Sequence, residues 1–289
     1  CSSDLLQRSL SNTAGAYVFP VGNGGTNYLP YTLTTSAASN PVITVQAFNA
    51  DAGASATFNN TLANISHTEY WREVLNSGTF TGTVSLTRQT ALGTFNKIAQ
   101  STAQSGSYAS IGGTVSGTSI NTSNSITSSG FFVMATGSTL TLANPTTAIT
   151  AANICASSVK VPIHAFNVTA NSTTNSLTNF AFTTTGTYTA SEIVNFKIWS
   201  NTTNSLASAT LLATNTTPAV AGTQTFPAFS QLINGTNYFW ITMDVATSVT
   251  NGRTLTVSAS TATDLTTNAS VTAGSASASG TQTLTISVA

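Results

Sequence analysis

The sequence predicts an all-β protein of two consecutive β-sandwich domains with Ig-like or jelly-roll-like character. Apolar and hydroxyl residues alternate over stretches of 5–8 residues, the pattern of a strand with one buried face. Turn-forming pairs such as Asn234-Gly235 and Asn251-Gly252 separate these stretches at the spacing of a sandwich. The length of 289 residues suits two domains of roughly 100–200 residues each.

In the first half, alternation predicts strands over residues 40–45 and 83–87. The apolar run Phe131–Met134 is expected to be the last core strand of the first domain. The second half is expected to open with a strand over residues 159–168. Pro162 indicates an edge strand or a bulge there, because proline cannot donate to a central ladder.

Three further strands are predicted in the second half, over residues 238–245, 254–258 and 283–288. In each of them every second side chain is apolar, which suits one buried and one solvated face. The helical signal is limited to Thr189 followed by Glu192. This spacing fits a capping box at the start of one or two helical turns.

The two domains are expected to cover residues 1–145 and 155–289. Asn144-Pro145 and the Ala/Thr-rich stretch that follows are typical of a short connector. Each domain should bury its own core, because a sandwich hides the inner faces of both of its sheets. The large side chains that we expect in these two separate cores are Trp71, Phe131, Trp199, Phe239 and Ile241.

Charged residues make up only 5% of the chain, against roughly 25% in ordinary soluble domains. The polar surface is supplied instead by 95 Ser and Thr and by 26 Asn. Seven scattered Lys and Arg and a net charge of zero cannot form the basic patch that nucleic acid or an anionic membrane requires. No apolar run reaches the roughly 18 residues of a membrane-spanning helix. We therefore expect a secreted, extracellular or cell-surface protein in its mature or trimmed form.

The first half carries an ordered series of motifs: Arg8, YVFPVG at 17–22, NYLPYTL at 27–33, Tyr70-Trp71-Arg72 and Phe131-Phe132. The series resembles a β-sandwich accessory module of the large surface proteins that gliding, type IX-secreting bacteria export. The resemblance covers most of residues 5–137.

The second half carries NGTNYFWI at 234–241, followed by Asp244 and Gly252. This pattern resembles the β-sandwich module found beside sialidase-like repeats in the same class of surface proteins, over roughly residues 159–289. Both resemblances imply accessory modules that bring no catalytic residues.

The side chains available for acid–base, metal or nucleophilic chemistry are few. They are His67, His164, Asp4, Asp51, Asp244, Asp264, Glu69, Glu73 and Glu192. The sequence has no G-x-S-x-G elbow, no glycine-rich phosphate loop and no HExxH motif. We therefore expect no enzyme activity, no catalytic residue, no metal ion and no cofactor.

Three positions could still bind an ion or a proton. His67 and Glu69 share a strand face with Trp71 if that segment is extended, but two ligands leave a zinc site unfinished, and a solvated strand start is the alternative. His164 is expected to be a packed or surface histidine. Asp244 could anchor one calcium ion with backbone carbonyls, or hydrogen-bond a turn.

Covalent modification leaves several alternatives open. Cys1 and Cys155 are candidate disulfide partners within or between chains; Cys1 could instead carry a lipid, or both thiols could be unrelated. Lys160, in the first strand of the second domain, could form an internal amide with an Asn near Asp244 or Glu192, or could simply extend along an edge strand. Candidate glycosylation sequons begin at Asn59, Asn64, Asn121, Asn167, Asn171, Asn201, Asn215, Asn234 and Asn268, and about nine are expected by chance from this composition.

The favoured function is a non-enzymatic subunit of an extracellular, pilus-like filament, because low charge suits a large buried interface. Residues 1–10 start the first sandwich abruptly and residues 280–289 end in a clean alternating strand. We therefore expect a terminal strand of one copy to complete a sandwich of the next. The alternative is a carbohydrate-binding or adhesin module, in which Trp199, Trp240 and Tyr238 would stack on surface glycans.

Overall fold

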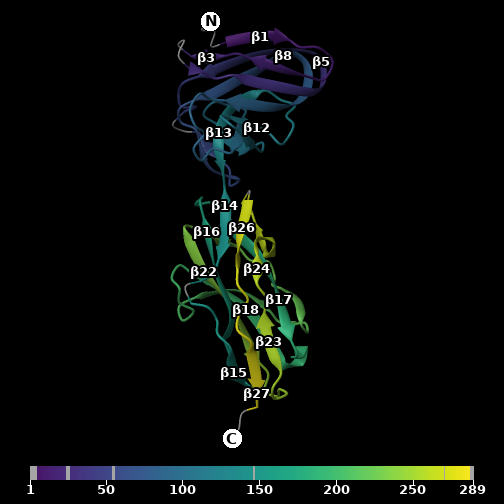
Figure 1. Ribbon diagram of the computed structural model, residues 1–289, viewed down its shortest axis with the longest axis vertical. Helices are drawn as coiled ribbons and strands as arrows, with labels where there is room; N and C mark the ends of the chain where they lie inside the picture. Colours follow the sequence, from purple (N-terminus) through teal and green to yellow (C-terminus); the bar gives the residue numbers. More distant parts are fainter. Residues whose placement is uncertain (1–4, 24–26, 54–55, 146, 270, 287–289) are drawn as a thin grey trace. The chain divides into compact units, whose positions relative to one another are not determined.

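The computed structural model describes residues 5–23, 27–53, 56–145, 147–269 and 271–286. Strands dominate, and the described helices are two single 3-10 turns, Ala190–Glu192 and Ala262–Asp264. The predicted all-β class is therefore confirmed. The chain divides into two compact units, Cys1–Gly137 and Ser138–Ala289, and Figure 1 labels several strands of each.

The first unit is built on one strongly bent sheet. The strands of the unit are β1 (Leu5–Ser9), β2 (Gly15–Phe19), β3 (Gly22–Asn23), β4 (Asn27–Tyr28), β5 (Tyr31–Phe48), β6 (Thr57–Phe58), β7 (Leu62–Ile65), β8 (Tyr70–Thr87), β9 (Lys97–Ser101), β10 (Ser107–Ser110), β11 (Thr114–Ser116), β12 (Ser119–Asn121) and β13 (Gly130–Gly137). All of them belong to this sheet except β3 and β4, which pair with each other. The long strands β5 and β8 pair antiparallel over almost their whole length. Because β1 and β2 pair with different halves of β5, the two halves form different parts of the sandwich.

The bend lies where the two long strands change register. Asn40 in β5 and Gly78 in β8 both have positive φ, 45° and 77°. The pairing shifts between Ser39 and Val42 at the same place. A Cβ on residue 78 would lie 2.3 Å from the Asn40 carbonyl oxygen, so only glycine fits this close backbone approach. The bend lets side chains from both halves of β5 and β8 share one core.

Strand β13 is buried on both of its faces. Phe132 and Met134 enter the main core of the unit together with Trp71. Val133 and Ala135 enter a smaller cluster on the opposite face. This explains why the segment reads as a continuous apolar run and not as alternation.

The second unit contains two seven-stranded sheets. Its strands are β14 (Thr139–Ala143), β15 (Ala152–Cys155), β16 (Val161–Ala170), β17 (Ser176–Gly186), β18 (Ile193–Asn201), β19 (Thr210–Asn215), β20 (Gly222–Thr225), β21 (Gln231–Leu232), β22 (Thr236–Val245), β23 (Thr254–Val257), β24 (Ser260–Thr261), β25 (Leu265–Thr267), β26 (Val271–Ala276) and β27 (Gln282–Thr285). One sheet runs β19-β18-β22-β16-β14-β26-β24 and the other runs β15-β27-β23-β17-β20. Both sheets contribute to a single core that contains Phe166, Phe180 and Phe239.

The boundary between the units lies earlier than the sequence suggested. Strand β14 pairs with β16 and, in parallel, with β26, as Figure 1 shows. Its side chains Leu140 and Leu142 are buried in the core of the second unit. The unit therefore begins at Ser138, and the expected first domain of residues 1–145 was too long. Strand β15 also pairs with β27, so the expected start at residue 155 was too late.

Three of the five predicted core residues are confirmed. Trp71, Phe239 and Ile241 are all fully buried, and the cores of the two units are separate. Phe131 is only partly buried and packs on the small outer cluster of the first unit. Trp199 is half-buried on the outer face of its sheet, because β18 turns Phe196 and Ile198 inward and its alternate residues outward.

The structure also bears on the expected capping box, on Pro162 and on the terminal strands. The capping box of Thr189 and Glu192 is present at the first 3-10 turn. Pro162 sits at a register shift of β16, which is an inner strand, so the proline marks a bulge and not an edge. Both terminal strands pair within their own unit: β1 with β5, and β27 between β15 and β23.

Candidate functional site

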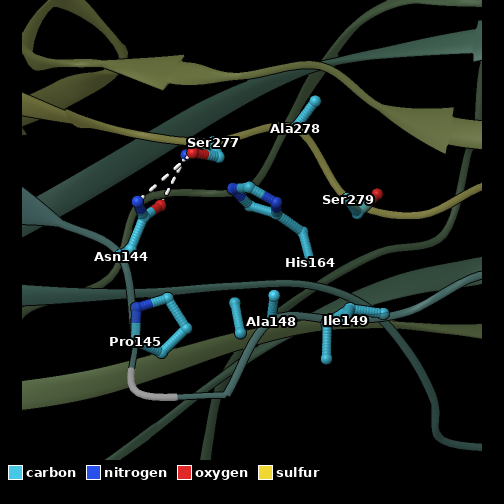
Figure 2. Close-up of a pocket in the computed structure, with 9 residues that line it drawn as sticks. Asn144, Pro145, Ala148, Ile149, His164, Ser277, Ala278 and Ser279 are labelled. Carbon is cyan, nitrogen blue, oxygen red and sulfur yellow. Dashed lines mark hydrogen bonds between the residues drawn. The ribbon is translucent and has the colours of Figure 1, made fainter.

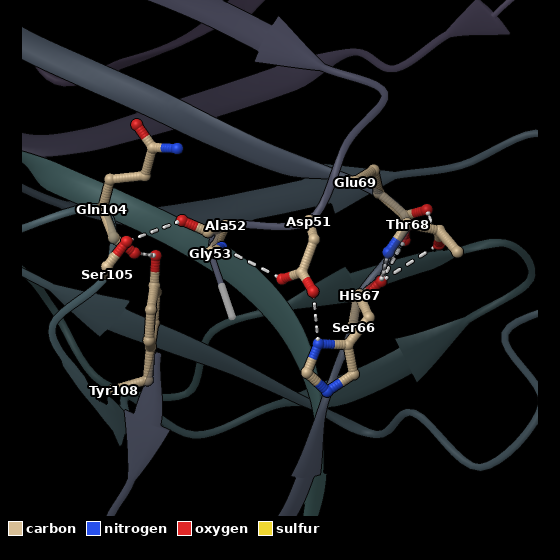
Figure 3. Close-up of polar contacts among 10 residues, drawn as sticks. All are labelled: Asp51, Ala52, Gly53, Ser66, His67, Thr68, Glu69, Gln104, Ser105 and Tyr108. Atoms are coloured by element: carbon tan, nitrogen blue, oxygen red, sulfur yellow. Dashed lines mark hydrogen bonds and ion pairs between the residues drawn. The ribbon is translucent and has the colours of Figure 1, made fainter. Parts of the chain in front are cut away.

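The described carboxyl groups accept hydrogen bonds from neighbouring groups of the chain. Asp51 accepts a hydrogen bond from Gly53 N–H at 3.0 Å, and His67 Nδ1 lies 3.0 Å from its other oxygen (Figure 3). The backbone hydrogen bond from Gly53, aided by His67, lowers the pKa of Asp51. The site is a solvated loop contact, since both side chains are well exposed.

Glu69 points into a separate set of contacts. Ser66 Oγ and Thr68 Oγ1 donate to its carboxylate at 3.0 and 2.6 Å, and Arg88 lies 3.5 Å away. Residues 66–69 form a bend between strands, so the extended segment that would have aligned His67 with Glu69 is not formed. Within the part of the chain that the structure describes, no three His, Cys, Asp or Glu side chains come together.

Glu73, which the sequence offered only as one of several available acids with no assigned role, is buried. It lies in β8 with 1% of its surface exposed, among the core side chains of the first unit. Tyr31 Oη donates a hydrogen bond to its carboxylate, and Ser129 Oγ donates another at 3.2 Å. Burial raises the pKa of Glu73 to about 7, although both hydrogen bonds oppose this shift. Its position two residues after Trp71 on the same strand face was the available signal.

The outer face of the second unit carries the aromatic residues that could meet a glycan. Trp199 in β18 pairs in register with Trp240 in β22, and Tyr238 stacks beside Trp240 with ring centroids 6.5 Å apart. Trp240 is only 6% exposed. One face of Trp199 is covered, because Lys160 Nζ lies 4.1 Å from the ring centroid. These rings are therefore poorly placed to stack on a sugar.

Lys160 does not sit where an internal amide would form. It lies in the loop before β16 with φ of 53°, not in the strand, and its ammonium group donates to the Leu206 carbonyl at 3.2 Å. Its backbone N–H donates to Asp244 at 2.8 Å, and Lys197 Nζ lies 2.5 Å from the other oxygen of that carboxylate. Burial opposes ionisation of Asp244, but these contacts outweigh it and lower its pKa. The Lys160 ammonium group is engaged by the Leu206 carbonyl and the Trp199 ring, while Asp244 binds the Lys160 backbone and Lys197. The cluster around Asp244 is therefore an ion pair that anchors a turn.

The second unit has a concave site beside His164. It has a volume of about 230 Å³ and is lined by Asn144, Pro145, Ala148, Ile149, His164, Ala165 and residues 277–279 (Figure 2). His164 is 1% exposed, and its Nε2 lies 3.0 Å from Ser260 Oγ. Burial lowers the pKa of His164 to about 4, so the ring is neutral at physiological pH. Of the two alternatives, packed or surface, His164 is the packed one, and it also lines a pocket.

The modification sites fall into distinct environments. Asn59, Asn64, Asn121, Asn171 and Asn234 are exposed, and Asn167, Asn201 and Asn268 are half-buried. Asn215 is only 7% exposed and its side chain accepts a hydrogen bond from Thr217 N–H, so its burial argues against glycosylation. Cys155 is an exposed free thiol, whereas Cys1 lies outside the described residues.

No family model matches the chain, and no curated protein is significantly similar to it. The resemblance to surface-protein modules therefore stays a prediction. Among the residues described, no helix is long and apolar enough to cross a bilayer.

Proposed function

We propose that this chain is a non-catalytic, extracellular structural protein whose sandwiches form a cell-surface filament by exchange of a terminal strand. The observation that supports the proposal is that the described carboxyl groups make structural contacts within their own unit. All six that the structure describes accept hydrogen bonds from their own fold. They are Asp51, Glu69, Glu73, Glu192, Asp244 and Asp264.

A surface made of hydroxyl and amide groups suits such a role. Large contacts between copies desolvate whatever lies in them, and unpaired charges make that desolvation costly. This chain carries only seven acidic and seven basic residues, and most of those described already have partners. Neutral Ser and Thr can be covered at a much smaller cost.

The N-terminal strand is the better candidate for exchange. Strand β1 is an edge strand that pairs with β5 alone, and four of its five residues are exposed. Strand β27 lies between β15 and β23, and its Leu284 is fully buried. Removing β1 exposes little apolar surface, whereas removing β27 opens the core of the second unit. A strand donated head to tail propagates into a filament when the rotation between copies does not close.

A disulfide trap tests the exchange. Gln7 in β1 lies opposite Thr44 in β5, so Gln7→Cys with Thr44→Cys, with serine at residues 1 and 155, reports where β1 is paired. Exchange predicts a ladder of covalent oligomers on non-reducing gels, and fibres by electron microscopy. The matched control is Thr34→Cys with Thr83→Cys, an opposed pair of β5 and β8 that stays within one chain. Monomers in both variants at every protein concentration would refute the proposal.

A further inference from the structure

The pocket beside His164 combines an apolar wall with polar groups that carry no charge. Pro145, Ala148 and Ile149 line one side, and Ser277 and Ser279 line the other. Figure 2 shows the imidazole of His164 lying between these two segments. No residue of the described lining is ionised at neutral pH, because the one titratable group, His164, is held neutral by burial.

The imidazole offers a polar atom that the fold has not used. Its Nε2 is engaged with Ser260 Oγ, and the described residues provide no hydrogen-bond partner for Nδ1. The Ser260 hydroxyl can rotate to donate or to accept, so either tautomer of the neutral ring is permitted. Nδ1 can therefore act as an acceptor or as a donor. A ligand hydroxyl, which is itself both donor and acceptor, matches this group better than an ion does.

The polar wall of the pocket is held in place before any ligand arrives. Ser277 N–H donates to Asn144 Oδ1 at 2.6 Å, and Asn144 Nδ2 donates back to Ser277 Oγ at 3.2 Å. Asn167 in β16 donates to the Asn144 carbonyl at 2.8 Å. These bonds tie both segments of the pocket to the sheet. A wall that is already ordered loses little conformational entropy on binding, which favours even a small ligand.

The geometry points to a binding site for one neutral sugar residue of a glycan, with a C–H face of the ring against Pro145 and Ile149 and a hydroxyl at His164 Nδ1. The volume of about 230 Å³ is smaller than the roughly 300–1,000 Å³ of drug-sized sites and suits a single ring. A charged ligand would lose its hydration without gaining a counter-charge. The assignment is independent of strand exchange, so either can fail without the other.

The test uses saturation-transfer NMR and calorimetry on the full chain. The probes are the methyl glycosides of glucose, galactose and mannose, N-acetylglucosamine, and sialic acid as the charged comparison. We expect saturable binding of at least one neutral sugar in the millimolar range. Because the His164 imidazole stays neutral, the affinity of the chain for that sugar should change less than twofold between pH 8 and pH 6.

Two exposed alanines of one loop provide matched variants. Ala148→Trp fills the pocket, and Ala151→Trp adds the same side chain outside it. The first should weaken binding at least tenfold, and the second should leave it unchanged. Failure of all the neutral sugars to bind at 20 mM (about −2.3 kcal/mol) would overturn the assignment. So would equal affinity in both variants, or a preference for sialic acid.

Discussion

Glu73 makes the first unit sensitive to pH in a direction opposite to that of most acids. Its carboxyl group is buried with hydrogen bonds from Tyr31 and Ser129 and no cation among its partners. Burial raises its pKa from 4.5 to about 7, so the folded state favours the protonated form. Stability from this group is greatest below pH 4.5 and is lost as the pH rises through 7. The shift corresponds to about 3 kcal/mol at alkaline pH.

The assay is urea unfolding at pH 5 and pH 8, followed by the fluorescence of Trp71 after Trp199 and Trp240 are replaced by phenylalanine. Between these two pH values the Glu73 contribution should fall by about 2–3 kcal/mol. Glu73→Gln keeps the shape and the acceptor for Tyr31 but cannot ionise. The difference in unfolding free energy between Glu73→Gln and the parent should therefore shift in favour of the variant by about 2–3 kcal/mol from pH 5 to pH 8.

Tyr31→Phe is the control, because it removes one hydrogen bond from the carboxylate while Glu73 still titrates. It should retain the pH dependence and move it to higher pH. Equal pH dependence in the parent and in Glu73→Gln would refute the reasoning, since some other group would then carry the effect.

Three further predictions concern stability. Gly78→Ala should lower the free energy of unfolding by roughly 1–3 kcal/mol or more, because φ is 77° and a Cβ would meet the Asn40 carbonyl. Gly117→Ala, where φ is 60° but the surrounding space is open, should lower it by only about 1–2 kcal/mol. Equal losses in thermal unfolding would contradict the close backbone approach at the bend. Asp244→Asn should lower the free energy of unfolding by about 1–3 kcal/mol, because the neutral amide cannot form the ion pair with Lys197. If solvent does not reach this ion pair, 1 M salt added to the parent should not reproduce the loss. Leu284→Ala should lower the free energy of unfolding by about 2–5 kcal/mol, because this side chain is fully buried. Leu211→Ala, at a side chain that is 43% exposed, should change the unfolding midpoint little. Similar midpoints for the two variants would mean that β27 contributes little to stability.

Local patterns predicted much of the fold because they depend on neighbours in the chain. The alternation at residues 254–258 became β23, and the spacing of Thr189 and Glu192 became a capping box. The boundary failed for a different reason. Leu140 and Leu142 alternate as in any strand, but only their pairing with β16 and β26 assigns them to the second unit. The pairing with β26 joins residues more than 100 positions apart, such as Thr139 and Val271.

The candidate site was less predictable than the fold. His164 was expected to be either a packed or a surface histidine, and it is packed. The pocket exists because Asn144, Pro145, Ala148 and Ile149 meet residues 277–279 there. Neither segment carries a motif. Trp199 was expected in the core, and a strand pattern alone cannot say which of its two faces is buried when both carry aromatic residues.

The amino-acid sequence by itself determined the all-β class, the two-unit organisation and the low content of charge, because composition and short-range alternation decide which segments can form half-buried strands. The tertiary structure alone decided where the units divide, which face of each strand is buried and which acids lose their solvent. These properties depend on register and on bulges such as those at Asn40 and Pro162. A shift of one residue in pairing exchanges the two faces of a strand, and long-range contacts select between the alternatives.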